Sequence, residues 1–524
     1  MTNTSTPADN PFVDPATSFE DAGRGNSFAA DATLALGRNV SLTLGTDSLI
    51  VLDEENEEGA GSNCCGLWSS GTANTRAIPF YNVLWAELKD SELTLQYASP
   101  VSKKVVRAAT LKYPVEYQMV EFVNKWIYRL LDRSYGESQR RKRVKVLVNP
   151  HSGKGSAEKW YHRDAEPLLK AANCAIDMVK TTYRGEAVLI SENLDIDAFD
   201  VIASVSGDGL PHEVFNGLGK RPDAKKALSK IAVVNIPGGS GNAMSCNLTG
   251  TDSPSLATLA IIKGIPTPLD LISITQGDTR TLSFLSQSVG IVAESDLATE
   301  HLRFLGGQRF TYGFLVRLIN KTVYPCDIAI KVAIDDKPAI REHYKKEQSN
   351  FEPASERRGY RSHHLLEDDA SASTGSGSND DTLPPLRYGT INDKLPDGWE
   401  LVPYDKLGNF YCGNMAYMAA DANFFSPALP NDGFMDLVCI NGDISRLHAM
   451  KMMFAVENGN FFDMPGVWYR KILGYRIIPK DQEDGFISID GERVPFQPFQ
   501  AEVHKGLGTV LSKSGHMYEA PGPI

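Results

Sequence analysis

The sequence predicts three folded parts: a small β domain closed by one helix, an α/β lobe built on a parallel sheet, and a lobe rich in antiparallel strands. The length supports three parts, because 524 residues correspond to about three domains at roughly 150 residues each. Strand-like and helix-like runs alternate between residues 144 and 266, which is typical of a parallel sheet. Short strand-like runs dominate residues 27–113 and 267–336 on either side.

The composition is that of a folded protein. Hydrophobic residues make up 42% and charged residues 23% of the chain, which is ordinary globular chemistry. With 53 Lys and Arg against 65 Asp and Glu, the net charge is −12, so we expect no nucleic-acid partner. No apolar run reaches the ~18 residues of a membrane span, and the polar N-terminus has no signal-peptide core. Seven cysteines, an odd number at low density, indicate a reducing compartment and a cytoplasmic protein.

The N-terminal part is expected to contain a disordered tail, residues 1–26, and a β domain, residues 27–137. Strand-like runs at 49–52, 83–85 and 93–95 are separated by turn residues. The helix that follows has apolar residues at helical spacing on one face: Met119, Phe122, Val123, Trp126, Ile127 and Leu130. Strands followed by one closing helix are the element order of a pleckstrin-homology-like module. No dense Lys/Arg loop marks a headgroup site, so lipid binding by this module stays open.

Cys64 and Cys65 lie in a Gly-rich, acidic stretch of this domain. We favour two free thiols in an exposed loop. The alternative is reversible palmitoylation, which would strengthen attachment to a membrane as a second anchor.

The α/β lobe is expected over residues 143–266. Its predicted strands are 144–148, 175–179, 201–205 and 231–236, and its predicted helices are 156–172, 185–193 and 211–218. The basic cluster at residues 140–143 precedes the first strand. We interpret it as a solvated linker, with a nuclear signal or an anionic-lipid patch as the alternatives.

The β-rich lobe is expected over residues 267–524, with one helical interruption at roughly 296–321. Residues 343–395 are rich in Ser, Gly, Asp and Pro. Their low apolar content predicts a disordered insertion inside this lobe.

Three glycine-bearing turns follow predicted strands of the α/β lobe: residues 149–155, 206–209 and 237–243. Ligands bind at the carboxyl ends of strands in such sheets. Glycine lets the backbone approach a phosphate, and N–H groups at the next helix start can hold the anion. One Gly-rich turn is weak evidence, but three in register predict a nucleotide site.

Neither common phosphate-binding fingerprint fits these turns. Lys154 is followed by Gly155, whereas a Walker A loop needs Ser or Thr there for magnesium, and no GxGxxG follows the first strand. Asp208 stands between two glycines directly after a strand. A carboxylate there can accept a hydroxyl proton or order magnesium near phosphates. The alternative for Asp208 is an ordinary turn residue.

The strings around these turns resemble a known family. SGDGLPHEVFNGL, residues 206–218, resembles a segment of sphingosine kinases, and NPHSGKG and PGGSGNA resemble the other nucleotide turns of the diacylglycerol-kinase-type lipid kinases. SDLATEHLRFLGGQRFTYG, residues 295–313, resembles the lipid- and phosphate-contacting helix, and IDGE, residues 489–492, a C-terminal element. IPFYNVLWAEL resembles an N-terminal segment of the fungal enzymes. The implied fold is an α/β nucleotide lobe with an antiparallel β-sandwich lipid-binding lobe.

The resemblance implies a role for each matching residue. Asp208 would be the general base. The ATP site would comprise Asn149, Ser152, Gly153, Lys154, Gly155, Thr181, Ser206, Gly207, Gly209, Glu213, Gly239, Ser240, Gly241, Asn242, Glu300, Arg303, Arg309, Asp490, Gly491 and Glu492. The lipid would contact Asp296, Ser206, Leu302, Phe310 and Phe314, with Phe284, Leu285, Val289 and Leu315 as further lining. Asp208 and Asp490 would lie near Mg²⁺, directly or through water.

The chemistry of the substrate agrees with these roles. A sphingoid base carries an ammonium group, for which Asp296 offers a charge-assisted hydrogen bond. Arg303 and Arg309 suit the distributed charge of a transferring phosphate. The alternatives are an N-cap role for Asp296 at the start of its helix and a solvated helix face for the two arginines.

The resemblance therefore predicts an ATP- and Mg²⁺-dependent kinase that phosphorylates the primary hydroxyl of sphingosine, dihydrosphingosine or phytosphingosine. Alternatives are a ceramide or diacylglycerol kinase, or a catalytically inactive lipid-binding scaffold. The expected partners are the lipid and a peripheral membrane surface, either intracellular or the plasma membrane. The sequence does not predict the oligomeric state.

Overall fold

The computed structural model describes residues 32–37, 39–53, 75–297, 323–350, 381–480 and 485–523, and of Lys154 only the backbone. These residues form two compact units, one of residues up to 95 with 111–134, the other of residues 96–110 with 135 onward. The expected tail, residues 1–26, lies outside the described residues, as do Cys64 and Cys65.

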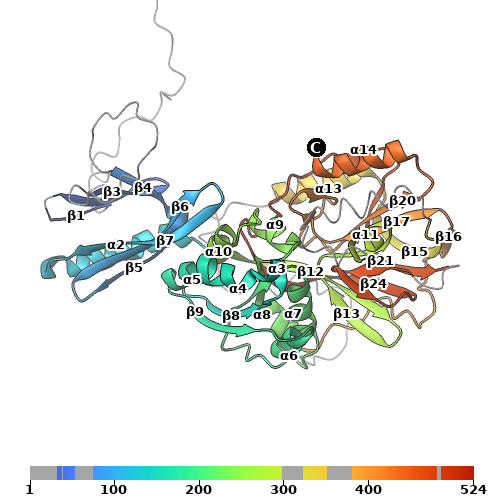
Figure 1. The fold of residues 1–524 in the computed structure, drawn as a ribbon, viewed down its shortest axis with the longest axis horizontal. Helices are drawn as coiled ribbons and strands as arrows, with labels where there is room; N and C mark the ends of the chain where they lie inside the picture. The colour runs from blue at the N-terminus through green and yellow to red at the C-terminus, as the bar shows by residue number, and fades with distance from the viewer. Residues whose placement is uncertain are drawn as a thin grey trace, which may run out of the picture. The chain divides into compact units, whose positions relative to one another are not determined.

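The N-terminal strands form two antiparallel sheets. Strands β1 (Thr33–Leu36), β2 (Val40–Leu44), β3 (Ser48–Asp53) and β4 (Thr75–Pro79) make a four-stranded sheet in sequential order. Strands β5 (Val83–Lys89), β6 (Glu92–Ser102) and β7 (Val105–Pro114) make a three-stranded sheet (Figure 1). Side chains alternate along a strand, so Leu42 and Leu44 of β2 are buried while their neighbours are more exposed.

Helix α2 (Val120–Tyr135) follows these strands, as the apolar spacing predicts. Val123, Trp126 and Leu130 are buried, which confirms the predicted apolar face. The Trp126 indole also donates a hydrogen bond to the Ala32 carbonyl at 3.2 Å. That bond ties the helix to the start of the first sheet.

The second unit contains the predicted parallel sheet. Its strands β9 (Ala175–Lys180), β8 (Arg143–Val148), β10 (Val201–Ser206) and β11 (Ala232–Pro237) are neighbours in that order and are all parallel. Every residue of β10 and β11 is buried, as expected where helices cover both faces. The four predicted strands are therefore confirmed.

Helices connect these strands, as Figure 1 shows. They are α3 (Ser152–Gly155), α4 (Ala157–Trp160), the π-helical turn η3 (Tyr161–Ala165), α5 (Glu166–Ala171), α6 (Glu186–Glu192), α7 (Gly209–Gly219), α8 (Ala224–Lys230), α9 (Ala243–Thr249) and α10 (Pro254–Ile262). Lys142, expected in a solvated linker before β8, is instead buried and donates to the carbonyls of Gln139 and Ile262 at 2.8 and 2.7 Å.

The remaining strands are mostly antiparallel. They are β12 (Ile265–Gln276), β13 (Thr279–Ser283), β14 (Ser286–Gly290), β15 (Cys326–Ile334), β16 (Val402–Tyr404), β17 (Leu407–Gly413), β18 (Tyr417–Ala419), β19 (Ala422–Asn423), β20 (Met435–Asn441), β21 (Trp468–Pro479), β22 (Ile487–Ile489), β23 (Glu492–Val494) and β24 (Phe499–Ser512). Strand β24 pairs antiparallel with β12 and β21, and parallel with β11 where Val510 lies opposite Val233. The parallel and antiparallel strands thus belong to one hydrogen-bonded sheet.

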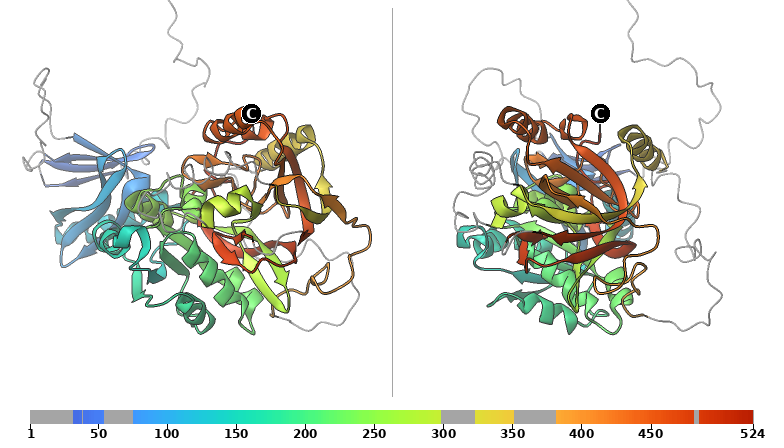
Figure 2. Two further views of the ribbon diagram at one scale, coloured as in Figure 1. Left: turned by 45° about the vertical axis from the view of Figure 1, so that its right-hand side comes forward. Right: turned by 90° about the vertical axis from the view of Figure 1, so that its right-hand side faces the viewer.

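Three helices accompany the antiparallel strands: α11 (Ile291–Leu297), α13 (Lys337–Ser349) and α14 (Arg446–Glu457). Helices α13 and α14 lie at the same end of these strands (Figure 2). Helix α13 contradicts the predicted start of the insertion at residue 343. Asp336 caps this helix, accepting from the Ala339 N–H at 2.8 Å, and Ile340 and Tyr344 bury one face.

The predicted end of the insertion also differs. Glu502 accepts hydrogen bonds from the N–H groups of Arg387 and Tyr388, both at 2.8 Å. Gln500 donates to the carbonyls of Tyr388 and Gly389, both at 3.0 Å. Side chains of β24 therefore hold the backbone of residues 387–389 through hydrogen bonds, and the Tyr388 ring also packs against Trp399 with centroids 5.3 Å apart. Of the expected insertion, residues 351–380 lie outside the described residues.

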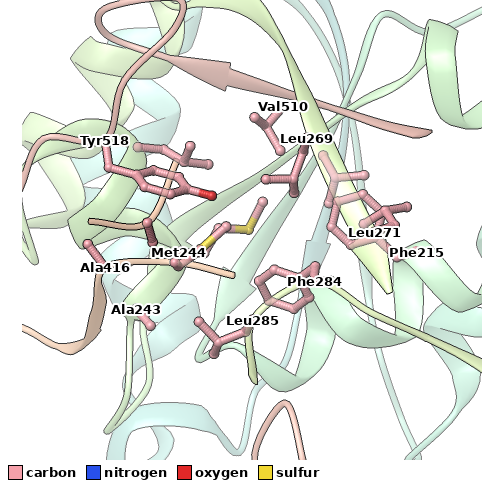
Figure 3. Packing of buried hydrophobic residues seen from close by; sticks show 14 of the residues in the cluster. Phe215, Ala243, Met244, Leu269, Leu271, Phe284, Leu285, Ala416, Val510 and Tyr518 are labelled. Carbon is pink, nitrogen blue, oxygen red and sulfur yellow. The ribbon is translucent and has the colours of Figure 1, made fainter. Parts of the chain in front are cut away.

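The core of the second unit joins the two kinds of sheet. Phe215 of α7 and Phe284, which follows β13, pack with ring centroids 5.4 Å apart. Leu269 and Leu271 of β12 and Val510 of β24 belong to the same cluster (Figure 3). Because these side chains come from both halves of the unit, the core fixes the parallel strands against the antiparallel ones.

Candidate active site

One cavity of about 900 Å³ lies in the second unit between the carboxyl ends of the parallel strands and the antiparallel strands. Its polar end contains the predicted base Asp208 and most of the residues predicted for ATP: Asn149, Ser152, Gly153, Gly155, Thr181, Ser206, Gly207, Gly209, Glu213, Gly239, Ser240, Gly241, Asp490, Gly491 and Glu492. The structure thus brings the three glycine turns and the C-terminal element to one place. Such a position at strand ends is where α/β sheets bind ligands.

The three glycine turns touch one another through their backbones. Gly153 has φ +56°, and a Cβ there would lie 2.2 Å from the Gly238 carbonyl oxygen. A Cβ at Gly239 would lie 2.3 Å from the Gly207 Cα atom. Any larger residue at either position would push the turns apart. This close approach explains the glycines without a ligand.

Two side chains stabilise the turns. The Ser152 hydroxyl accepts from the Gly207 N–H at 3.2 Å, which links the first turn to the second. The Asn242 amide accepts from the Gly239 N–H at 2.9 Å and donates to its carbonyl at 3.1 Å. Asn242, predicted to touch ATP, does not line the cavity and instead shapes the third turn. The Lys154 side chain lies outside the described part of the chain.

Asp208 lies directly before helix α7 and faces the cavity. Its two carboxylate oxygens accept from the N–H groups of Ala243 and Met244, both at 2.9 Å, at the start of helix α9. Burial raises the pKa of Asp208 to about 6, although these two hydrogen bonds act in the opposite direction. A carboxyl group with this pKa is ionised near neutral pH and can still accept a proton.

Asp490 also lines the polar end, and protein donors surround its buried carboxylate. Four donors come from the chain between β13 and β14: the Ser283 hydroxyl at 2.6 Å and the N–H groups of Phe284, Leu285 and Ser286 at 2.9–3.1 Å. The fifth is His212, whose Nδ1 lies 2.8 Å from Oδ2. This carboxylate therefore fixes the antiparallel part of the cavity wall.

The described residues do not provide a protein cage for a metal ion. No group of three or more His, Cys, Asp or Glu side chains converges among them. The five donors around Asp490 occupy both of its oxygens, so Asp490 does not fit as a direct ligand of Mg²⁺. Of the two carboxylates predicted near Mg²⁺, Asp208 accepts two hydrogen bonds from helix α9 and faces the cavity, so it fits a metal ion better than Asp490 does.

Two further acidic residues border the polar end. Glu213 of α7 accepts from the N–H groups of Gly185 and Ala187 at 3.0 and 3.2 Å, and so caps helix α6. Glu492 of β23 forms an ion pair with Arg184 from the loop after β9. This pair joins the loop after β9 to the antiparallel strands beside the cavity.

The other end of the cavity is apolar. Its lining comes from α11, β17, β20, α14 and the loops between them, and includes Val292, Met418, Phe424, Ile440, Ile444, Ala449, Met452, Val456 and Phe461. Asp296 of α11 also lines the cavity, and its carboxylate lies beside Gly491. Because α11 begins at Ile291, Asp296 is not the N-cap that the sequence offered as its alternative role.

The predicted lipid-contacting residues divide into three groups. Leu285, Ser206 and Asp296 line the cavity. Phe284 and Val289 do not, because Phe284 belongs to the core of Figure 3 and Val289 to a second core cluster. The remainder lie outside the described residues, together with three predicted ATP contacts: Leu302, Phe310, Phe314, Leu315, Glu300, Arg303 and Arg309.

Sequence reasoning missed several residues of this site. His212 was visible inside the SGDGLPHE string, but its partner Asp490 lies 278 positions away. The cavity is also lined by four apolar or aromatic residues that the sequence does not distinguish from core residues: Tyr411, Phe424, Met452 and Phe461. Their spacing is the same whether the side chains line a cavity or fill a core.

Two family models match parts of this chain. The family model described as the diacylglycerol kinase catalytic domain matches residues 143–274. One described as a domain of unknown function (DUF7493) matches residues 32–136. A solved structure titled as a putative diacylglycerol kinase from Bacillus anthracis str. Sterne is similar at 17% identity and a TM-score of 0.47, covering 72% of this chain and 96% of that one.

The parallel sheet with its three glycine turns is thus a catalytic domain of the diacylglycerol-kinase type. "Sphingoid long chain base kinase 5" of Saccharomyces cerevisiae is 36% identical over 74% of this chain and 62% of its own length. "Sphingoid long chain base kinase 4" of Schizosaccharomyces pombe is 35% identical over 83% of this chain and 88% of its own length. The chain belongs to the sphingoid long-chain-base kinase family.

"Sphingosine kinase 1" of Homo sapiens is also similar, at 28% identity over 71% of this chain and 91% of its own length. The chain spans about three fifths of the length of the Saccharomyces relative, 62%. None of the helices in the described ranges has the length and hydropathy needed to cross a membrane.

Proposed function

We propose that this protein transfers the γ-phosphate of ATP to the primary hydroxyl of a sphingoid long-chain base. The observation that carries the proposal is a single cavity with glycine turns at one end, an apolar lining at the other, and Asp208 facing it beside the turns. The names of the similar kinases support the choice of substrate.

The reaction needs a base, a positioned phosphate and a leaving group. The Asp208 carboxylate accepts the proton of the lipid hydroxyl, and the oxygen attacks the γ-phosphorus in line. The bond from the γ-phosphorus to the β–γ bridging oxygen breaks, and ADP leaves with that electron pair. Backbone N–H groups of the three turns hold the phosphates during this step.

The ammonium group of the base selects the substrate class. Asp296 lines the cavity where the apolar lining begins and can accept a charge-assisted hydrogen bond from it. A ceramide or diacylglycerol has no charge there and would leave the carboxylate without a cationic partner. The apolar lining beyond accommodates the hydrocarbon chain.

We propose three parts of the chain for this reaction. Residues 27–137 would form a pleckstrin-homology-like module, a proposal supported by its four-stranded and three-stranded sheets and the helix α2. Residues 143–266 would be the ATP lobe, and residues 267–524 a β-sandwich lipid lobe. The lipid substrate requires peripheral attachment to a membrane, to which palmitoylation of Cys64 and Cys65 would contribute.

The test is a transfer assay with the full chain. Labelled ATP and magnesium are supplied with vesicles containing sphingosine, ceramide or diacylglycerol. We expect label only on the sphingoid base, and none with Asp208→Asn. Asp296→Asn should lower kcat/KM for the base by about 30-fold, since a hydrogen bond to a charged group contributes about 1.5–3 kcal/mol.

Asp443→Asn serves as the matched control, because Asp443 pairs with Lys406 on the surface and is half exposed. It should retain the activity of the unmodified chain. Label on ceramide or diacylglycerol instead of the base, or full activity of Asp208→Asn, would contradict the proposal.

A further inference from the structure

A row of hydroxyl groups lines the cavity at the boundary between its polar and apolar ends. Tyr411 of β17 lies directly opposite Ser288 of β14 in the antiparallel pair, and Ser286 lies two residues before Ser288. Opposed residues of an antiparallel pair point to the same face, as do residues two apart on one strand. All three side chains accordingly line the cavity.

The Tyr411 ring is held in place by other aromatic rings. Its centroid lies 5.2 Å from that of Phe424 and 5.0 Å from that of Phe425, both in edge-to-face arrangements. Only 6% of Tyr411 is exposed. Its hydroxyl is hydrogen-bonded to Ser286. The hydroxyl therefore has a defined position.

Tyr411 stays neutral and keeps its proton. Burial raises the pKa of its hydroxyl far above the ordinary value, and the charges of Asp296, Asp208 and Asp490 raise it further. Tyr411 lines the same cavity as Asp208 and Asp296, the residues proposed for the reacting end of the lipid. The rings of Phe424 and Phe425 place it, at the same time, against the apolar end.

A phenol at this boundary is poorly matched to a plain hydrocarbon chain. Beside it the lining is apolar, with Met418, Phe424 and Phe461 as examples. The Tyr411 hydroxyl keeps its hydrogen bond with Ser286, but a phenol can form a second one. A bound methylene group would exclude the water that supplies this second bond, which costs free energy at a buried polar group. A substrate hydroxyl at the same place would accept or donate such a bond.

We propose that Tyr411 determines specificity for a sphingoid base with a third hydroxyl, on carbon 4, as in phytosphingosine. This inference rests on the proposed function. In such a base, carbon 1 carries the reacting hydroxyl near Asp208 and carbon 2 the amine near Asp296. Carbon 3 carries a hydroxyl in every sphingoid base, so carbon 4 is the first position at which the chains differ. Dihydrosphingosine has a methylene group there and is otherwise the same.

The experiment measures kcat/KM for phytosphingosine and dihydrosphingosine with the full chain and with Tyr411→Phe. We expect the unmodified chain to favour phytosphingosine by about tenfold, as one buried hydrogen bond allows. Tyr411→Phe removes only the hydroxyl. It should bring the ratio close to one by lowering the phytosphingosine value, with less than about a twofold change for dihydrosphingosine.

Tyr475→Phe is the matched control. Tyr475 is a buried tyrosine of the same sheet whose hydroxyl donates to Gln287 at 3.2 Å, and it does not line the cavity. It should leave the substrate ratio unchanged. Direct binding of the two bases to the unmodified chain gives the same comparison if Tyr411→Phe does not fold.

The outcomes separate this inference from the proposed function. No phosphorylation of either base by the unmodified chain would overturn both. Phosphorylation with an equal preference for the two bases, or a preference that Tyr411→Phe retains, would overturn the inference alone. An equal loss for both bases in Tyr411→Phe would also overturn it, because the hydroxyl would then contact carbon 3.

Discussion

The imidazole of His212 lies 2.8 Å from the carboxylate of Asp490 and joins helix α7 to the turn between β22 and β23. Asp490 also holds the backbone of Phe284, Leu285 and Ser286. The backbone N–H of His212 donates to the Asp208 carbonyl at 3.2 Å, one helical turn back. This pair therefore sets the position of the proposed base relative to the opposite cavity wall.

Replacing His212 with Asn should lower kcat by about tenfold or more while changing the KM for ATP little, because the turns that hold ATP remain. Asp490→Asn should do the same, and the double variant should lose less than the sum of the two free-energy changes, as expected for directly paired residues. His162→Asn, on an exposed helix face beside Glu166, is the control. Additive losses from the two single variants would contradict this coupling.

The pKa of Asp208 predicts the pH dependence of the reaction. Because the folded-state pKa is about 6, the base is protonated and inactive below that pH. We expect kcat/KM to rise with pH through about 6 and to level off above 7. A pH–rate profile at saturating ATP measures this. An acid limb near pH 4 would indicate that Asp208 is not desolvated as the structure has it.

The same pKa has a consequence for stability. The ordinary value for the carboxyl group is 3.8, so the folded chain holds this proton more tightly than the unfolded chain. The contribution of Asp208 to stability is therefore present at low pH and is lost as pH rises from about 4 through about 6. Asp208→Asn should remove this slope from the pH dependence of the free energy of unfolding.

The contact between Gly153 and Gly238 predicts that a side chain at residue 153 weakens the binding of ATP. Gly153→Ala would combine a positive φ with a Cβ placed 2.2 Å from a carbonyl oxygen, so we expect the KM for ATP to rise by about tenfold or more. Gly277→Ala is the matched control, because Gly277 has φ +55° and no atom within 4 Å of its Cβ position. It should lower the melting temperature by a few degrees and leave the KM for ATP unchanged. Equal kinetic effects of the two changes would exclude the contact as the cause.

A buried ion-pair cluster should dominate the stability of the antiparallel part. The Lys471 ammonium lies 2.8 Å from Asp432 and 3.0 Å from Asp436, with all three side chains at most 2% exposed. Lys471→Met would remove the ammonium group shared by the two buried carboxylates, leaving Asp432 with His343 at 3.2 Å and Asp436 with the Tyr469 hydroxyl at 2.9 Å. We expect a loss of about 3–5 kcal/mol in the free energy of unfolding. Lys406→Met removes an exposed pair with Asp443 at 2.9 Å and should cost at most about 1 kcal/mol. Denaturant unfolding of both variants makes the comparison.

Local patterns in the sequence were sufficient for the parallel sheet and for one half of the site. Continuous apolar runs predicted β10 and β11, and the glycine turns predicted the polar end of the cavity around Asp208. These features depend on residues close together in the chain. The catalytic-domain match over residues 143–274 covers the same stretch.

Contacts between residues far apart in the chain, and the hydrogen-bond partners of polar side chains, could not be predicted in the same way. His212 bonds Asp490, which lies 278 positions away in the chain. Tyr411 lies opposite Ser288, 123 positions away, because of the register between β14 and β17. Composition alone was misleading for α13, because a mostly charged segment forms a helix once Asp336 caps it and Ile340 and Tyr344 find an apolar surface. Polar segments can thus be ordered by a few well-placed partners.

The pairing of β24 with β11 has a consequence for synthesis of the chain. Strand β11, residues 232–237, emerges from the ribosome about 275 residues before β24 is complete at Ser512. Until then one edge of the nascent parallel sheet has no partner, which is a known hazard for aggregation. Truncated chains that stop before residue 499 should therefore be far more sensitive to protease within residues 143–266 than the full chain, and equal resistance would show that the ATP lobe matures without its last strand.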